Sequence, residues 1–134
     1  MLEPSRPAHT LTIPGQLPGL NEYIAAERSI RYKAAGMKRD AEQKIVLIAR
    51  TQLRGVQVTG PVIMHYTWYE RTKRRDKDNI AFAKKFVQDA LVKAGVLQGD
   101  GWAYIQGFTD NFDVDPAKPR IEVRITEIQK GLSA

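Results

Sequence analysis

Two aspartates stand inside a strongly basic run at residues 73–82. Asp76 and Asp78 are two positions apart, and the residues around them are Lys73, Arg74, Arg75 and Lys77. The basic side chains would attract a phosphate that the two carboxylates would repel. A cation between the carboxylates and the phosphate removes this conflict, because Mg²⁺ binds carboxylate and phosphate oxygens together. The run therefore predicts a metal site, and a solvated turn with locally paired charges is the alternative interpretation.

The spacing of these aspartates suits a shared ligand. In an extended stretch the side chains alternate, so Asp76 and Asp78 would point to the same side. Lys73, Arg74 and Arg75 would then hold the neighbouring phosphates, since guanidinium groups match phosphate oxygens in pairs. We expect Mg²⁺ as the metal, with Mn²⁺ as an alternative.

Further acids follow along the chain. Asp100 lies between two glycines, which allow a tight turn, so it is available as a third ligand. A rival cluster consists of Asp110, Asp113 and Asp115, but it lacks the spacing of an EF-hand and contains no basic residue. We interpret the rival cluster as part of a solvated loop at Asp110–Pro119.

A helix is predicted at Ile80–Ala94, directly after the aspartates. Asp78 or Asn79 would cap its first turn, and Gly95 follows its last residue. This helix would carry any lysine that acts with the aspartates.

The two sides of this helix differ in character. At about 100° per residue, Asp78, Lys85 and Asp89 share the polar side, whereas Lys84 lies about 100° or more away from them. Lys85 is therefore the lysine placed to act with Asp78, and Lys84 stays open as the alternative. Asp89 is interpreted as a structural partner of lysines one turn away. The apolar side consists of Ile80, Ala83, Val87, Ala90, Leu91 and Ala94.

The remaining elements must position this motif. Apolar alternation predicts strands, and the 3.6-residue period predicts helices. The resulting order β-α-β-α-β-β is typical of an α+β fold, with a small mixed sheet packed by two main helices. The predicted elements are His9–Ile13, Ala34–Leu53, Val62–Glu70, Ile80–Ala94, Trp102–Phe108 and Arg120–Glu127. In the last strand Ile121, Val123 and Ile125 would form the buried side.

Length and composition narrow the class of protein. The 134 residues favour a single domain over residues 1–134, with 1–8 as a loose N-terminal arm. The formal net charge of +6 favours an anionic partner such as nucleic acid. The absence of cysteine excludes disulfides, zinc–thiolate sites and cysteine nucleophiles. No signal peptide or membrane span is apparent, so we expect a soluble, cytoplasmic protein.

Three segments together resemble the RusA family of Holliday-junction resolvases. These are Asp76-Lys-Asp78-Asn79, the helix with Lys85 and Asp89-Ala-Leu91, and the segment Gly95–Asp100. The resemblance is strongest over residues 70–108. It implies a RusA-like fold, metal-binding and catalytic roles for Asp76, Asp78 and Asp100, and a catalytic lysine at Lys85. Two features depart from the family: Gly99 stands where a second adjacent acid is common, and the segment between Asp78 and Asp89 is longer.

The resemblance implies a Mg²⁺-dependent endonuclease that resolves Holliday junctions in DNA recombination and repair. A four-way junction has near two-fold symmetry and must be cut on two strands, so we expect a homodimer. A competing interpretation is a noncatalytic nucleic-acid-binding protein with Tyr66, Trp68 and Trp102 as stacking platforms. A third is a metal-dependent nuclease that acts on other branched DNA.

Overall fold

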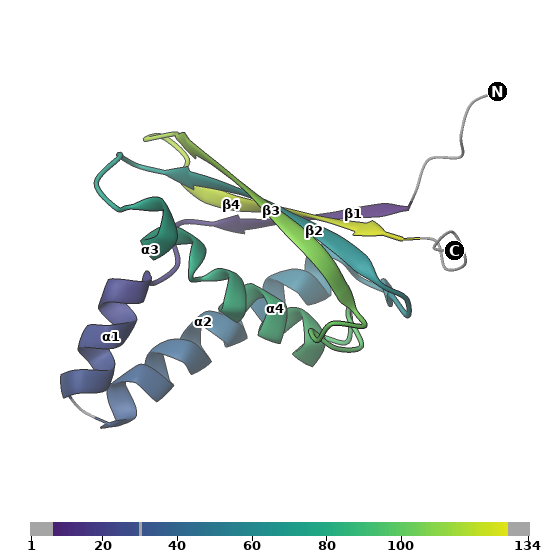
Figure 1. Cartoon of the computed structure of the whole chain (residues 1–134), viewed down its shortest axis with the longest axis horizontal. Helices are drawn as coiled ribbons and strands as arrows, with labels where there is room; N and C mark the ends of the chain where they lie inside the picture. Colours follow the sequence, from purple (N-terminus) through teal and green to yellow (C-terminus); the bar gives the residue numbers. More distant parts are fainter. Residues whose placement is uncertain (1–6, 30, 129–134) are drawn as a thin grey trace.

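The computed structural model describes residues 7–29 and 31–128 (Figure 1). Within them the chain is mixed α and β, with a four-stranded mixed sheet, so the α+β prediction is confirmed. The elements in chain order are β1 (Ala8–Pro14), α1 (Leu20–Ser29), α2 (Arg31–Gln52), β2 (Val62–Glu70), α3 (Lys77–Ala81), α4 (Lys84–Lys93), β3 (Ile105–Val114) and β4 (Arg120–Glu127).

The sheet has the strand order β1-β4-β2-β3. Strands β2 and β3 run parallel, and α3 and α4 form the crossover between them. The other two neighbouring pairs, β1 with β4 and β4 with β2, are antiparallel. In the parallel pair Val62 lies opposite Ile105 and Glu70 lies opposite Val114, so both strands end at the same edge of the sheet.

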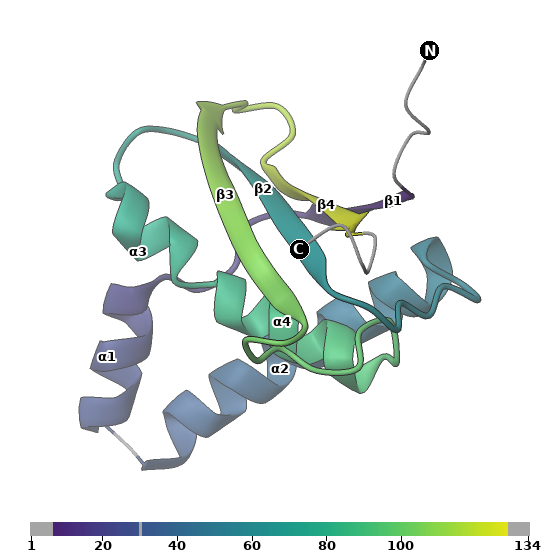
Figure 2. The same ribbon diagram turned by 45° about the vertical axis from the view of Figure 1, so that its right-hand side comes forward.

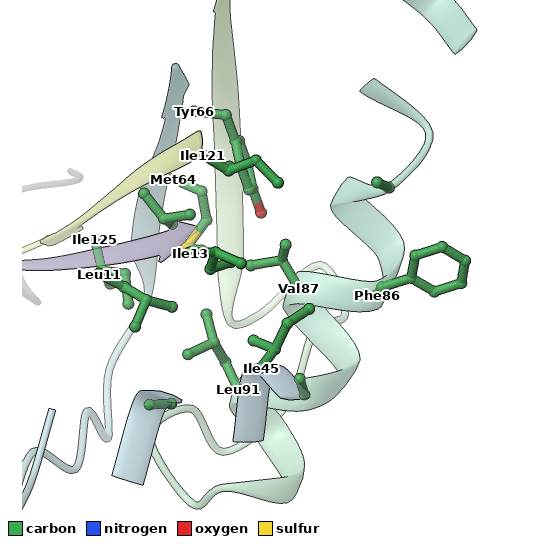
Figure 3. Packing of buried hydrophobic residues seen from close by; sticks show 14 of the residues in the cluster. Leu11, Ile13, Ile45, Met64, Tyr66, Phe86, Val87, Leu91, Ile121 and Ile125 are labelled. Atoms are coloured by element: carbon green, nitrogen blue, oxygen red, sulfur yellow. The ribbon is translucent and has the colours of Figure 1, made fainter. Parts of the chain in front are cut away.

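The helices lie on one side of the sheet, which makes two layers (Figures 1 and 2). The core between the layers is built from the inward side chains of the sheet, including the predicted Ile121, Val123 and Ile125. Figure 3 shows Val87 and Leu91 of α4 pointing toward these strands. The predicted apolar side of this helix is thus confirmed, apart from a half-buried Ala94.

Helix α1 was not predicted from the sequence, and it begins at Leu20, within the turn-forming residues at 14–21. Phe82 and Phe86 pack against it through Tyr23, whose ring centroid lies 5.3 and 6.1 Å from theirs. In Figure 3, Phe86 accordingly points away from the cluster between α4 and the sheet. An aromatic group therefore joins α1 to the crossover that carries the aspartates.

The predicted helix at Ile80–Ala94 is interrupted. The amides of Ala83, Lys85 and Phe86 donate to carbonyls three residues earlier, at 3.2, 3.2 and 3.0 Å, in place of the α-helical partner four residues earlier. Such bonds tighten the turn to about three residues, so the 100° rotation per residue does not hold across it. The prediction that Asp78 and Lys85 share a side of one continuous helix therefore loses its geometric basis.

The third strand also differs from its prediction. β3 begins at Ile105 and continues to Val114, so Trp102 lies outside it, and residues 110–114 are strand, not loop. Backbone pairing with β2 holds this polar segment extended, because strand formation depends more on its neighbours than on its own composition.

At the N-terminus the predicted arm ends earlier than expected. Pro7 accepts a hydrogen bond from the amide of Glu127 at 2.9 Å, and Ala8 belongs to β1. The rest of the predicted arm lies outside the described residues. In the described ranges, none of the helices combines the length and apolar character needed to cross a membrane.

Candidate functional site

A hollow of about 590 Å³ opens where β2 and β3 both end. Asp76 and Asp78 line it from the connection after β2, and Phe112 and Asp113 line it from β3. In sheets with parallel strands, ligands commonly bind beyond the carboxyl ends of those strands. The hollow is therefore the candidate site, and it brings the two predicted aspartates together.

Asp76 and Asp78 reach the hollow from the start of a helix. Asp76 is the N-cap residue of α3, with φ −68° and ψ 154°, and its side chain makes no capping hydrogen bond. Asp78 lies in the first helical turn, and its Oδ1 accepts from the amide of Asn79 at 2.9 Å. Both side chains are exposed. The predicted cap at Asp78 or Asn79 is wrong, because the helix begins earlier. The extended backbone predicted for the pair is found at Asp76 but not at Asp78, which is helical.

Asn79 has a positioning role that sequence reasoning missed. Its Oδ1 accepts a hydrogen bond from the amide of Asn21 at 2.9 Å, in the first turn of α1. Gly19 before that turn has no side chain with which to cap it, and a Cβ there would lie 2.5 Å from the same oxygen. Asn79 thus satisfies an amide that has no partner inside the helix. In the sequence, the turn-forming residues at 14–21 and the position of Asn79 after Asp78 were both visible, but neither feature predicts that the two segments touch.

Arg75 is committed to the protein itself. Its Nε and Nη2 donate to the two carboxylate oxygens of Glu70, both at 2.8 Å, and its Nη1 donates to the carbonyl of Leu17 at 3.1 Å. Glu70 is only 6% exposed, and a buried carboxylate requires such a partner. The prediction that Arg75 grips phosphate is therefore corrected. Lys73 lines the hollow and is exposed, and its sequence neighbour Arg74 is exposed as well.

The burial of Glu70 has a sequence signal. Every second residue of β2 points into the core, and Glu70 continues that alternation after Val62, Met64, Tyr66 and Trp68. The period of two therefore places a carboxylate inside, and a nearby cation must accompany it.

The two lysines of α4 have different surroundings. The ammonium of Lys84 pairs with Asp110 and lies 3.7 Å from the ring centroid of Phe108, and its side chain is 12% exposed. The side chain of Lys85 is 63% exposed and lies 3.7 Å from Asp89. The structural role predicted for Asp89 is thus confirmed. Lys84 binds the edge strand to the helix layer, whereas the ammonium of Lys85 faces solvent.

Asp110 belongs to a partly buried polar group that the sequence did not reveal. It accepts a hydrogen bond from Trp68 Nε1 at 2.8 Å, and the rings of Trp68 and Tyr66 stack with centroids 5.4 Å apart. Burial, and secondarily the charge of Asp110, raises the pKa of Tyr66 far above its ordinary value, while a hydrogen bond from Gln88 opposes this. Because Tyr66 and Trp68 are both buried, they cannot serve as the stacking platforms proposed for them.

The rival acid cluster is divided between different surroundings. Asp110 faces the helices, the neighbouring Asp113 is exposed, and Asp115 follows the strand. Asp115 pairs with Arg120 at 2.7 Å, and this hydrogen bond holds the pKa of Asp115 below its ordinary value. Hydrogen bonds to Glu122 and Asp115 raise the pKa of Arg120. The three carboxylates therefore do not form a calcium-type loop.

Asp100 lies at the other end of the crossover. It is exposed in the turn before β3, whose first residue Ile105 pairs with Val62 at the start of β2. The hollow lies beyond the opposite end of the same strands, about 25 Å away at roughly 3.3 Å per residue. Figure 2 shows α3 and this turn at opposite ends of β3. One chain therefore does not bring Asp100 to Asp76 and Asp78.

Potential metal ligands in the described part of the chain occur in groups of fewer than three side chains. No group of three or more histidine, aspartate or glutamate side chains there is arranged to hold an ion. Asp76 and Asp78 remain a pair of predicted oxygen donors at one hollow, which Asp113 of β3 also lines.

Comparison with known proteins adds no family assignment. The chain matches no protein-family model and no curated protein sequence. The resemblance to RusA resolvases therefore stays a prediction, which rests on the residues of the three segments Asp76–Asn79, Lys85–Leu91 and Gly95–Asp100.

Proposed function

We propose that this chain is a Mg²⁺-dependent, structure-specific DNA endonuclease that resolves four-way junctions by paired phosphodiester cleavage. The observation that carries the proposal is the pair of exposed carboxylates, Asp76 and Asp78, at the rim of one hollow. Exposed Lys73 and Arg74 adjoin the pair, and the chain has a formal net charge of +6. This combination suits a polyanion that approaches together with a divalent cation.

The donor set fits magnesium. Mg²⁺ in proteins usually takes one or two carboxylates from a chain, keeps several waters and completes its shell with substrate phosphate, so Asp76 and Asp78 match the contribution expected of one chain. Bound Mg²⁺ would supply Lewis acidity at the scissile phosphate and activation of an attacking water. Mn²⁺ accepts the same oxygen donors and is the alternative.

The basic side chains would then have different roles at the DNA backbone. Lys73 and Arg74 hold phosphates next to the scissile one. Arg75 contributes indirectly, since its bonds to Glu70 fix the start of the segment that carries the aspartates. Lys85 is favoured over Lys84 for stabilising charge on the phosphate, because Lys84 is engaged by Asp110 and nearly buried.

Paired cleavage implies a homodimer with two-fold symmetry, because a junction must be cut on two strands and each chain would supply one Asp76–Asp78 pair. Asp100 enters this proposal only through the dimer. Since about 25 Å separates it from the aspartates of its own chain, it could join Asp76 and Asp78 only from the second copy.

The direct test compares Asp76→Asn and Asp78→Asn with wild-type protein on a labelled four-way junction, with and without Mg²⁺. Each variant should lose cleavage by more than about 100-fold, because a direct ligand matters at least as much as its supporting groups. Junction binding should persist or tighten, because a negative charge near phosphate is removed. Asp40→Asn, which removes an exposed acid on α2, is the charge-matched control and should cut normally. Full activity in both site variants would contradict the metal site.

Mixed dimers test whether Asp100 of one copy acts with Asp76 and Asp78 of the other. Asp76→Asn and Asp100→Asn should each be inactive alone, and a mixture should recover nicking of one strand. The reason is that each proposed site combines Asp76 of one chain with Asp100 of the other. In a dimer of one Asp76→Asn chain and one Asp100→Asn chain, one site therefore has both substitutions, and the other site has neither. An inactive mixture would show that Asp100 does not act across the dimer.

Other substrates separate the remaining alternatives. Three-way, flapped and linear DNA should be cut more slowly than the four-way junction, and cuts in the junction should be paired and symmetric. Tight binding without Mg²⁺-dependent cutting would favour a noncatalytic nucleic-acid-binding protein. Preferred cutting of flaps would favour a nuclease for other branched DNA.

A further inference from the structure

Trp102 is the most exposed large apolar side chain in the described part of the chain. Its relative exposure is 98%, whereas that of Trp68 is 1%. Tryptophan is usually well buried, because its ring offers a large apolar surface. A fully exposed indole is therefore unusual, and its whole ring is available to a ligand or partner.

The turn that carries Trp102 is an ordered structure. The amides of Tyr104 and Ile105 both donate to the carbonyl of Gly101 at 3.0 Å, and Gln106 Nε2 donates to the carbonyl of Trp102 at 3.4 Å. The ring of Tyr104 packs so closely on Gly99 that a Cβ there would lie 2.7 Å from it. These contacts hold the backbone while the indole stays in solvent, so the ring is presented ready for contact.

The surroundings of the indole favour a flat ligand over a protein groove. Its neighbours Asp100, Gly101 and Ala103 are exposed and small or charged, so they add little apolar area. Protein interfaces bury clusters of large side chains, and hot spots lie inside well-packed patches. A single ring accessible on both faces is what an unstacked nucleobase requires, because every base has a π-face that stacks on aromatic side chains.

The other exposed aromatic side chain of this region, Phe108, lacks this freedom. The ammonium of Lys84 lies 3.7 Å from its ring centroid and covers one face. Lys84 is in turn held by Asp110. The observations therefore single out Trp102.

We infer that Trp102 is a base-stacking residue, which takes an unstacked nucleobase of the branched DNA. This inference rests on the proposed function and names a second contact for the same substrate. In the proposed dimer Asp100 approaches the scissile phosphate, and Trp102 follows two residues later, within about 7 Å along the chain. The acid then faces the cation at the backbone while the indole faces a base of the same strand.

Intrinsic fluorescence tests the inference, because Trp102 is exposed and Trp68, the second tryptophan of the chain, is buried. Binding is measured in EDTA, where no cutting occurs, with a four-way junction that carries 2-aminopurine at the branch point. Stacking should quench Trp102 emission and lower the 2-aminopurine signal. Trp102→Ala should bind at least about fivefold more weakly, and Trp102→Phe should stay within about twofold of wild type, because it keeps a ring. Tyr32→Ala, which removes another exposed ring on α2, should bind normally.

The outcomes separate the two claims. Wild-type protein that neither binds nor cuts the junction would sink the proposed function itself. Wild-type binding and cutting, with equal affinity for Trp102→Ala and no quenching, would overturn the stacking inference alone. A third outcome would assign the indole to a protein interface: Trp102→Ala changes from dimer to monomer in light scattering, while junction binding by wild type leaves both the Trp102 emission and the 2-aminopurine signal unchanged. That outcome would overturn the stacking inference as well.

Discussion

The two ends of the α3–α4 crossover are held in place by different kinds of interaction. At the end with Asp76 and Asp78, side-chain hydrogen bonds hold the chain, those of charged Arg75 with Glu70 and that of the neutral amide of Asn79 with the first turn of α1. At the end with Trp102, the backbone does it, through two amides on the carbonyl of Gly101. The exposed carboxylates at the first end thus have a buried ion pair behind them, whereas the turn at the second end combines backbone hydrogen bonds with the packing of the Tyr104 ring on Gly99.

This difference leads to different vulnerabilities. The first end should be sensitive to changes of charge at buried positions, because an unpaired buried ion is costly. The second end should be sensitive to added volume, because a ring and a glycine are already in close contact.

Glu70→Gln should have the largest effect on stability, a loss of about 2–3 kcal/mol, because it leaves Arg75 without its buried counterion. The expected signature is a lower midpoint of urea unfolding with an unchanged slope. Glu22→Gln is the matched control, since the side chain of Glu22 is 58% exposed and 3.6 Å from the same guanidinium. It should cost under about 1 kcal/mol. Equal losses in the two variants would mean that burial does not distinguish the two acids.

Gly99→Ala should cost about 1–2 kcal/mol, because the new Cβ would meet two carbon atoms of the Tyr104 ring at 2.7 and 2.8 Å. Gly101→Ala makes the same chemical change two residues later, where nothing lies within 4 Å of the added carbon. It should leave stability within about 0.5 kcal/mol of wild type. Thermal unfolding of both variants checks the contrast, and a greater loss for Gly101→Ala would refute the packing argument.

The smallest expected effect is a dependence of stability on pH at Asp115, near the first end. Its pKa in the folded protein is lowered, chiefly by the hydrogen bond from Arg120. The pair therefore stabilises the fold at and above the ordinary aspartate pKa of about 3.9, and this contribution disappears as the pH falls through the lower pKa of the folded state. Denaturant unfolding between pH 5 and 2 should show a shallower decline for Asp115→Asn than for wild type. Identical pH profiles would show that the pair adds nothing.

Strands with strong alternation could be predicted closely from the sequence. β2 and β4 occupy the predicted residues, because apolar residues at every second position bury one face whatever the neighbouring strand is. The apolar side of α4 was predictable for the same kind of reason. β3 was not, because Thr109, Asp110 and Asn111 carry no apolar pattern, and only pairing with β2 holds them extended.

Part of the candidate site was predictable in the same way. Asp76 and Asp78 stand out by their basic surroundings, and they do line one hollow. The prediction failed for Arg75, because its partner Glu70 becomes buried only when β2 packs against the helices. It left Lys84 and Lys85 unresolved, because a tightened turn between α3 and α4 alters the rotation that the ideal helix assumes.

Local pattern along the chain thus decides which segments are extended or helical, where the acids lie within the basic run, and which side of each element is apolar. The fold decides which charges are already used. Asn79 reaches an amide 58 residues away, and Lys84 reaches a carboxylate 26 residues away. Such pairs depend on strand register and helix packing, which bring distant residues within about 3 Å, and no short-range period in the sequence reports that approach. The separation of Asp100 from Asp76 has the same origin, because parallel pairing of β2 and β3 sends the two ends of the crossover to opposite edges of the sheet.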